Sequence, residues 1–411
     1  MLRRLLKILD PGLPGKVWLL QFGVLINFFG NGMVAPFLVI YLHFGRGIPL
    51  ALAGSAVALG GITAVTSGLL AGALGDRLGS RNVLVGGMTC NALAYLLYTQ
   101  VTAPSEAFAV GTLVGVGTGT YGPSAQNLLA SMVSADNRAT AFAQNRVTAI
   151  VGLGLGGVIG GFVAAAGLEG YLRLLVLDAL TFLLFAVFAL LLPSGRGTSA
   201  ARTESGGYWS VLRDRAFVRL VALNIALVAA GIAPMLVLLA AYAKGQAHIS
   251  TPAIGAIYAA NTFTIVVTQL PLTRLAQTRD RMQVLRTGSL LWVAFWLIVL
   301  GAGAWLNGLG AALVIGAAAV IYALGECLYT AVMLPTAAAL APDHLRGRYL
   351  GAMGLAWQTG FLIGPAAGGA ILAASPLALP AVCATICLVA AASTRSLAPA
   401  LRPGRVTAAA R

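Results

Sequence analysis

Apolar runs of about 20 residues or more recur from Val17 to Ser396, and they restrict the fold of this chain more than any other feature. A helix needs about 20 apolar residues to cross about 30 Å of hydrocarbon, so each run is long enough to span a membrane. Only 9% of the 411 residues are charged, whereas about a quarter of the residues in soluble domains are charged. The sequence therefore predicts a multi-pass membrane protein and argues against a soluble enzyme.

Apolar length, charged gaps and Gly/Pro punctuation predict an all-α membrane protein with twelve transmembrane helices. We expect these helices at residues 17–42, 50–75, 83–101, 107–133, 140–166, 171–193, 216–243, 251–274, 284–305, 309–339, 348–374 and 377–396. An even number of spans places both termini on the same side of the membrane.

The net charge of the chain is +15, but the basic residues stand in gaps between apolar runs and form no stripe with aromatic residues, which argues against nucleic-acid binding. The positions of the lysines and arginines indicate instead how the spans are oriented. Of the 26 lysines and arginines, all except Arg46, Arg173 and Lys244 fall on the side of the N-terminus. The positive-inside rule then places both termini in the cytoplasm and the chain in the cytoplasmic membrane.

The two halves of the chain repeat at a constant offset. This offset pairs Arg138 with Arg346, Gly152 with Gly360, Gly156 with Gly364, Gly160 with Gly368, Gly161 with Gly369 and Tyr121 with Tyr329. The repeat predicts a six-helix bundle at residues 1–193, a cytoplasmic linker at 194–215 and a second six-helix bundle at 216–411. In transporters with parallel repeats the substrate site lies between the halves near the membrane midplane, and we expect the same here.

The sequence contains no nucleotide-binding loop, no paired catalytic acids and no metal-ligand spacing. The four cysteines, Cys90, Cys327, Cys383 and Cys387, all fall within expected spans, as buried hydrophobic residues do. We therefore expect no enzyme activity, no metal and no other cofactor. Energy for transport would come from an ion gradient, most simply protons.

A short motif, G-A-L-G-D-R-L-G-S-R, follows the second expected span. Gly72 allows close helix approach, Gly79 permits a tight turn, and Asp76, Arg77 and Arg81 can pair with helix ends. The motif resembles the loop signature G-x-L-a-D-R-x-G-R-[KR] of the major facilitator superfamily and departs from it at Ser80. The resemblance implies a twelve-span transporter in which Asp76 latches onto the eleventh helix and favours the outward-facing state.

Two glycine stripes lie within the fifth and eleventh expected spans. The first, Gly152 to Gly161, resembles the antiporter signature G-x3-G-P-x2-G-G of this superfamily, with Gly157 in the place of the proline. The eleventh span holds the intact pattern, which comprises Gly360, Gly364, Pro365, Gly368 and Gly369. The resemblance points to antiport, while tight helix packing alone would also explain the small residues.

Two acidic residues lie inside apolar spans, and acids in membranes are functional by default. Glu326 lies near the middle of the tenth span with the hydroxyls of Tyr322, Tyr329 and Thr330 one turn away. Its Gly-Glu context resembles a multidrug/proton antiporter subgroup, although this chain lacks that subgroup's acids in the fifth and seventh helices. Asp178, in the sixth span, would serve either as a proton relay or as a structural hydrogen-bonding group.

The first span has a face of small and polar residues, with Gly23, Asn27, Gly30 and Asn31 at helical spacing. We expect Asn27 and Asn31 to line the substrate cavity, with a hydrogen-bonded helix seam as the alternative. Arg146 of the fifth span is a further cavity candidate. Weaker candidates are Gln126, Asn261, Gln269, Trp357 and Gln358.

The sequence thus predicts a monomeric secondary transporter that exchanges protons for small amphiphilic drugs or metabolites across the lipid bilayer. An importer or facilitator of a sugar or organic acid would have the same fold, because fold does not fix function. An intramembrane enzyme or a lipid scramblase is the alternative from another class.

Overall fold

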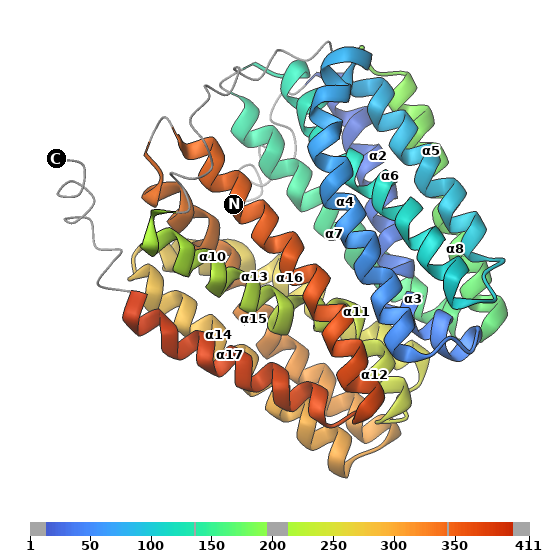
Figure 1. Ribbon diagram of the computed structural model, residues 1–411, viewed down its shortest axis with the longest axis vertical. Helices are drawn as coiled ribbons and strands as arrows, with labels where there is room; N and C mark the ends of the chain where they lie inside the picture. Colours follow the sequence, from blue (N-terminus) through green and yellow to red (C-terminus); the bar gives the residue numbers. More distant parts are fainter. Residues whose placement is uncertain (1–13, 135–136, 195–212, 343–344, 398–411) are drawn as a thin grey trace. The chain divides into compact units, whose positions relative to one another are not determined.

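The computed structural model describes residues 14–134, 137–194, 213–342 and 345–397 of the chain, all of whose regular elements are helices (Figure 1). Among these residues, 10 helices are long and apolar enough to cross a membrane. The expected third and fourth spans form α5 (Ser80–Tyr98) and α6 (Pro104–Met132), which are not among the 10. Both helices contain many Gly, Ser, Thr and Asn residues, which lower their mean hydropathy. The fold is therefore an all-α membrane fold.

The chain forms two compact units, Met1–Val34 with Ile62–Thr203, and Ala35–Gly61 with Glu204–Arg411. The first unit contains α2 (Gly15–Val34), the second part of α4 (Leu50–Leu78), α5, α6, α7 (Arg138–Ala164) and α8 (Leu168–Leu190). Within it, α2 packs against α7 and α8, and α5 packs against α6 and α8.

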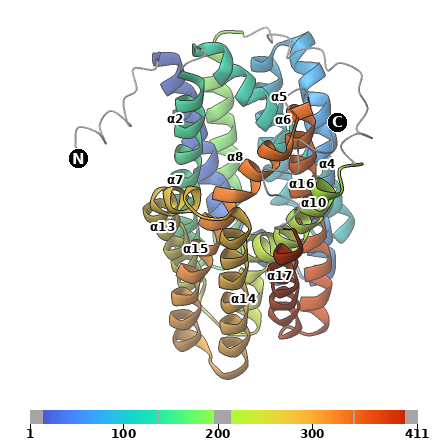
Figure 2. The same ribbon diagram turned by 90° about the vertical axis from the view of Figure 1, so that its left-hand side faces the viewer.

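The second unit contains the start of α4 and the helices from α10 onward. Its long helices are α10 (Arg215–Leu227), α13 (Thr251–Gln277), α14 (Arg281–Trp305), α15 (Gly308–Leu340), α16 (Arg346–Ala374) and α17 (Ala378–Leu397). Here α10 packs against α16 and α17, and α14 packs against α15 and α17, as Figure 2 shows for α14. These are the same pairings as in the first unit, shifted by the sequence repeat, so corresponding helices have corresponding neighbours.

The expected first and seventh spans are interrupted rather than continuous. Before Pro36 the helix α2 ends, and the chain continues as α3 (Leu38–Ile40) and the π-helix η1 (Tyr41–Gly45). The seventh span runs from α10 through the π-helix η3 (Val228–Ile232), α11 (Ala233–Val237) and α12 (Leu239–Gly245). Proline lacks the N–H that a continuous helix needs, and π-turns accommodate an extra residue at such points.

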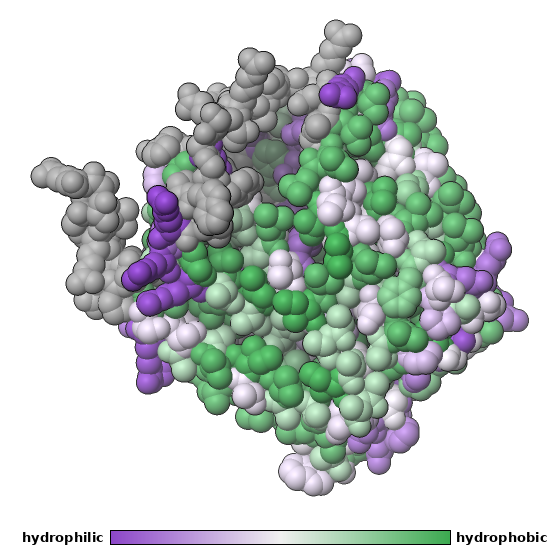
Figure 3. Space-filling model, viewed as in Figure 1, coloured by the Kyte–Doolittle hydropathy of each residue, from purple (hydrophilic) through white to green (hydrophobic). Residues whose placement is uncertain are grey.

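Acidic residues mark the polar ends of helices. Asp214 accepts hydrogen bonds from the backbone N–H groups of Ala216 and Phe217 at the start of α10, and Asp280 caps α14. Glu106 accepts backbone N–H groups of Thr102 and Ala103 at 2.7 and 3.1 Å, which lowers the pKa of its carboxyl. In Figure 3 hydrophobic side chains follow the helices over most of the face drawn, and hydrophilic side chains gather near the end of α17.

Candidate functional site

Glu326 lies on α15 in the second unit and is half-buried. The other acids that the structure describes in this unit, Asp214 and Asp280, are at helix N-termini. Among the described acids of this unit, Glu326 is therefore the one that lies in the middle of a helix. Tyr322 and Tyr329 stand one turn before and one turn after it on the same continuous helix. Helix geometry therefore puts both tyrosines on the side of α15 that carries Glu326, and their part in proton coupling stays a prediction.

Tyr329 connects α15 to two other helices. Its hydroxyl donates a hydrogen bond to Oδ1 of Asn224 on α10, and Asn224 Nδ2 donates to the Met353 carbonyl of α16 at 3.4 Å. Tyr329 is 3% exposed and Asn224 is buried, so this network is shielded from solvent. The hydroxyl expected to face Glu326 is thus used to hold α10, α15 and α16 together.

Aromatic rings surround the same stretch of α15. Trp292 of α14 stacks on Tyr322 at 5.6 Å between ring centroids, and its indole N–H donates to the Tyr322 carbonyl at 3.1 Å. Tyr329 lies 5.5 Å from Trp292 and 6.1 Å from Trp357 of α16. We refer to Asn224, Trp292, Tyr322, Glu326, Tyr329 and Trp357 as the Glu326 cluster.

Thr330, the third hydroxyl expected near Glu326, turns back onto its own helix. Its hydroxyl is 2.9 Å from the Glu326 carbonyl and 3.3 Å from Oε1 of Gln269 on α13. The amide of Gln269 in turn approaches the Cys327 carbonyl at 3.5 Å. Thr330 and Gln269 therefore link α13 to α15 beside the acid.

Asp178 of α8 is fully buried in the first unit, at 0% exposure. Oδ1 accepts a hydrogen bond from the Thr181 hydroxyl at 2.9 Å, and Oδ2 has no hydrogen-bond partner among the described residues. The carboxyl packs directly against Gly30 of α2, where a Cβ would overlap it. A carboxyl in this setting needs a proton or an undescribed partner to avoid a large desolvation cost.

The polar face of α2 points towards α8. Gly23 packs on Phe185 and Gly30 packs on Asp178, so the glycines of this face form a helix seam. Asn27 lies between them, buried, with no partner for its Oδ1 among the described residues, and Asn31 Nδ2 donates to the Asn27 carbonyl at 3.2 Å. Asn27 and Glu326 belong to different units, and their place on one cavity stays a prediction.

The loop motif joins α4 to α5 through Gly79, whose φ of +83° is a conformation that glycine adopts readily. Arg81 donates from Nη1 to the Leu192 carbonyl at 3.1 Å, beyond the last turn of α8, where a cation is favourable. Arg77 is exposed, and Gly72 lies within α4. The side chain of Asp76 is outside the described part of the chain, so its latch role stays a prediction.

The two glycine stripes form helix contacts. In α7, a Cβ at Gly152 would lie 2.6 Å from the Leu25 carbonyl of α2, and one at Gly160 would lie 2.6 Å from the Met33 carbonyl. In α16, Gly360 and Gly364 pack in the same way against the seventh span. The remaining stripe residues Gly156, Gly161, Pro365, Gly368 and Gly369 are buried as well.

The other candidates from the sequence are dispersed. Arg146 on α7 and Gln126 on α6 are exposed, and Gln358 on α16 is half-buried. Asn261 on α13 is buried, and its Oδ1 has no partner among the described residues. The sequence analysis missed Asn224 and Trp292. Each is a side chain with a hydrogen-bonding group inside an apolar run, and this feature could have marked them as candidates.

Comparisons with known proteins agree with this architecture. The family model described as Major Facilitator Superfamily matches residues 20–250 and 221–410. The multidrug resistance protein MdtH of Cronobacter sakazakii is 26% identical over 359 residues, which are 86% of each chain. A Na(+), Li(+), K(+)/H(+) antiporter of Planococcus maritimus is 30% identical over 135 residues, 31% of each chain. The crystal structure of peptide transporter POT in complex with sulfate is similar with a TM-score of 0.77 at 17% identity, covering 96% of both chains.

Proposed function

Because the chain belongs to the major facilitator superfamily and is a membrane transporter, we propose that it is a proton-coupled exporter of small amphiphilic drugs or metabolites. In this proposal protons enter as substrate leaves, by alternating access. The Glu326 cluster supports the proposal, because Glu326 stands on α15 one turn from Tyr322 and Tyr329, and the Tyr329 ring lies 6.1 Å from that of Trp357.

An acid inside a membrane is stable when it is protonated, paired or hydrated. A protonated Glu326 needs no counter-ion, whereas an ionised one attracts a cation. The faces of tyrosine and tryptophan rings attract organic cations by about 0.5–2 kcal/mol, and their area accommodates apolar groups. A proton and an amphiphilic cation therefore compete for the same carboxyl, which is the requirement for antiport.

The names of relatives support export. MdtH is named for multidrug resistance and matches most of this chain, and the Planococcus protein is named as a proton antiporter. The peptide transporter has the same fold, and at 17% identity this likeness says nothing about the substrate of the present chain.

We further propose that α5 and α6 complete a set of twelve spans, with both termini in the cytoplasm. The distribution of lysine and arginine supports this orientation. The packing of α5 on α6 and α8 within the first unit supports their membrane location. The protein would work as a monomer, with Asp178, Asn27, Asn31 and Arg146 as further candidates for proton or substrate contacts.

A substrate panel in everted membrane vesicles tests the proposal. An imposed pH gradient, acidic inside, should drive accumulation of at least one amphiphilic cation, and collapsing the gradient should release it. Accumulation in right-side-out vesicles instead would indicate an importer. Movement of labelled lipid in liposomes without any gradient-driven flux would indicate a scramblase.

A further inference from the structure

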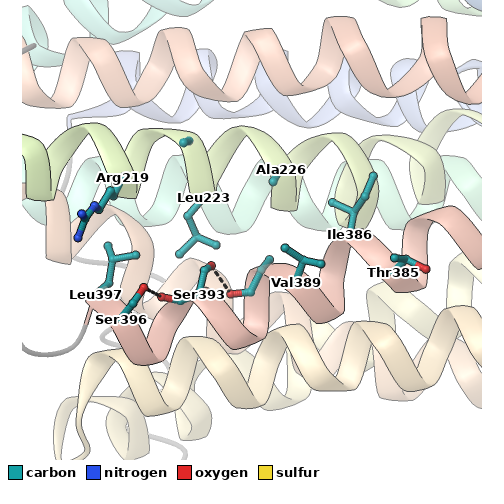
Figure 4. A pocket seen from close by; sticks show the side chains of 11 residues that line it. Arg219, Leu223, Ala226, Thr385, Ile386, Val389, Ser393, Ser396 and Leu397 are labelled. Atoms are coloured by element: carbon teal, nitrogen blue, oxygen red, sulfur yellow. Dashed lines mark hydrogen bonds between the residues drawn. The ribbon is translucent and has the colours of Figure 1, made fainter.

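A groove of about 470 Å³ runs between α10 and α17 (Figure 4). From α10 it is lined by Arg219, Ala222, Leu223 and Ala226. From α17 it is lined by Thr385, Ile386, Val389, Ala390, Ser393, Ser396 and Leu397. Its volume lies within the range of about 300–1,000 Å³ that is typical of ligand sites.

The groove is long, and apolar side chains line most of its length. On α17 it extends over the 13 residues from Thr385 to Leu397, whose Cα atoms span about 18 Å along the helix axis at about 1.5 Å per residue. One leaflet of a bilayer contributes about half of the roughly 30 Å hydrocarbon core. Ala222 and Ala226 leave the space between the helices open. The groove therefore has the length and the lining of a single acyl chain.

One end of the groove is positively charged. Arg219 is exposed, and no described residue forms a hydrogen bond or ion pair with it. Arg215, one turn earlier on the same face of α10, is exposed as well. No acidic residue lines the groove, and the nearby Asp214 is already bonded to Ala216 N, Phe217 N and the Tyr349 hydroxyl.

The serines at this end present oxygen acceptors. The Ser393 hydroxyl donates to the Ala390 carbonyl and the Ser396 hydroxyl donates to the Ser393 carbonyl, both at 2.8 Å, as the dashed lines in Figure 4 show. Their remaining lone pairs can accept a hydrogen bond from a head-group hydroxyl, whereas the backbone glycerol of a diacyl lipid is fully esterified and has none to donate. Arg219 supplies the donors for a phosphate and repels an ammonium group.

We propose that this groove binds an anionic glycerophospholipid, with its phosphate on Arg219, a head-group hydroxyl near Ser396, and one acyl chain along Ala226 and Ile386. Basic pockets between transmembrane helices on the cytoplasmic side are known sites for anionic head groups. The start of α10 and the end of α17 are cytoplasmic in the orientation proposed above, so the lipid comes from the cytoplasmic leaflet. The site itself does not depend on proton coupling or on export.

The test is native mass spectrometry of the purified full-length protein with equal amounts of phosphatidylglycerol and phosphatidylcholine of identical chains. The unchanged protein should retain phosphatidylglycerol preferentially. Arg219→Gln should weaken that retention about five-fold, the contribution expected of one arginine near an anionic lipid, and leave phosphatidylcholine unchanged. Arg279→Gln is the matched control, because Arg279 is exposed in the same unit but lies outside the groove.

A second variant tests the acyl chain. Ala226→Phe fills the groove and should reduce retention of both lipids, whereas Ala392→Phe, on an exposed face of α17 outside the groove, should not. Equal retention of the two lipids by the unchanged protein would overturn the proposal. So would an Arg219→Gln protein that binds phosphatidylglycerol as well as the Arg279→Gln control does.

Discussion

The two tyrosines that flank Glu326 offer a sharp test of the cluster, because they differ in one respect. Both are buried, Tyr322 at 1% and Tyr329 at 3% exposure, and both rings stack on Trp292 or lie close to it. The Tyr329 hydroxyl bonds to Asn224, whereas the Tyr322 hydroxyl has no hydrogen-bond partner among the described residues. Replacing each with phenylalanine removes only the hydroxyl.

Tyr329→Phe should destabilise the protein by about 1–2 kcal/mol. Hydrogen bonds between transmembrane helices contribute about 0.6 kcal/mol on average and about 1.7 kcal/mol at most. The substitution also leaves Asn224 Oδ1 buried without a hydrogen-bond donor, and the lost solvation of that oxygen adds a cost of about 1 kcal/mol. Tyr322→Phe removes a buried hydroxyl that has no described partner, so it should be neutral or slightly stabilising.

Thermal unfolding of the purified variants in one detergent, followed by tryptophan fluorescence, measures the difference. Tyr329→Phe should unfold several degrees below the unchanged protein, and Tyr322→Phe should unfold at or above it. Equal destabilisation by both substitutions would refute the assignment of the Tyr329 hydroxyl as the link between α10 and α15.

Three further predictions concern the glycines and the loop. Gly152→Ala should destabilise the protein by about 1–3 kcal/mol in thermal unfolding, because the new Cβ would lie 2.6 Å from the Leu25 carbonyl. The control Gly354→Ala, whose Cβ would meet nothing within 4 Å, should not destabilise it, and equal effects of the two would contradict the close contact of α7 with α2. Gly79→Ala should lower the free energy of unfolding by about 1–3 kcal/mol, because alanine is strained at the positive φ of this position. Gly86→Ala, whose Cβ would enter open space on α5, should leave the stability unchanged, and a Gly79→Ala protein of unchanged stability would contradict the turn. Asp76→Asn should slow gradient-driven transport per folded molecule, and an unchanged rate would remove Asp76 from the mechanism.

Helix type and position were predictable because membrane-spanning helices leave a strong apolar signal. The glycine spacing of α7 and α16 likewise predicted close helix contacts, since only small residues let backbones approach. The helix interruptions in the first and seventh spans lie near prolines, Pro36 and Pro234, which are visible in the sequence. Their effect on the first and seventh spans depends on how neighbouring helices satisfy the freed carbonyls, which periodicity does not encode.

The partners of the site residues were harder to predict. Glu326 was identified because a charge in an apolar run is conspicuous, and its tyrosine neighbours follow from helix geometry. The bond from Tyr329 to Asn224 joins residues 105 positions apart, and no local pattern specifies it. Similarly, helical spacing grouped Gly23, Asn27 and Gly30 on one face, but only the packing of α2 on α8 shows what that face contacts.

The most direct test of proton exchange at Glu326 is the proton release that accompanies substrate binding to purified protein in weakly buffered detergent solution. Once the vesicle panel has provided a transported cation, its addition should acidify a solution of the unchanged protein. A Glu326→Gln protein, folded and still able to bind the cation, should release no protons. Undiminished proton release by Glu326→Gln would contradict the account, because the proton would then come from another group.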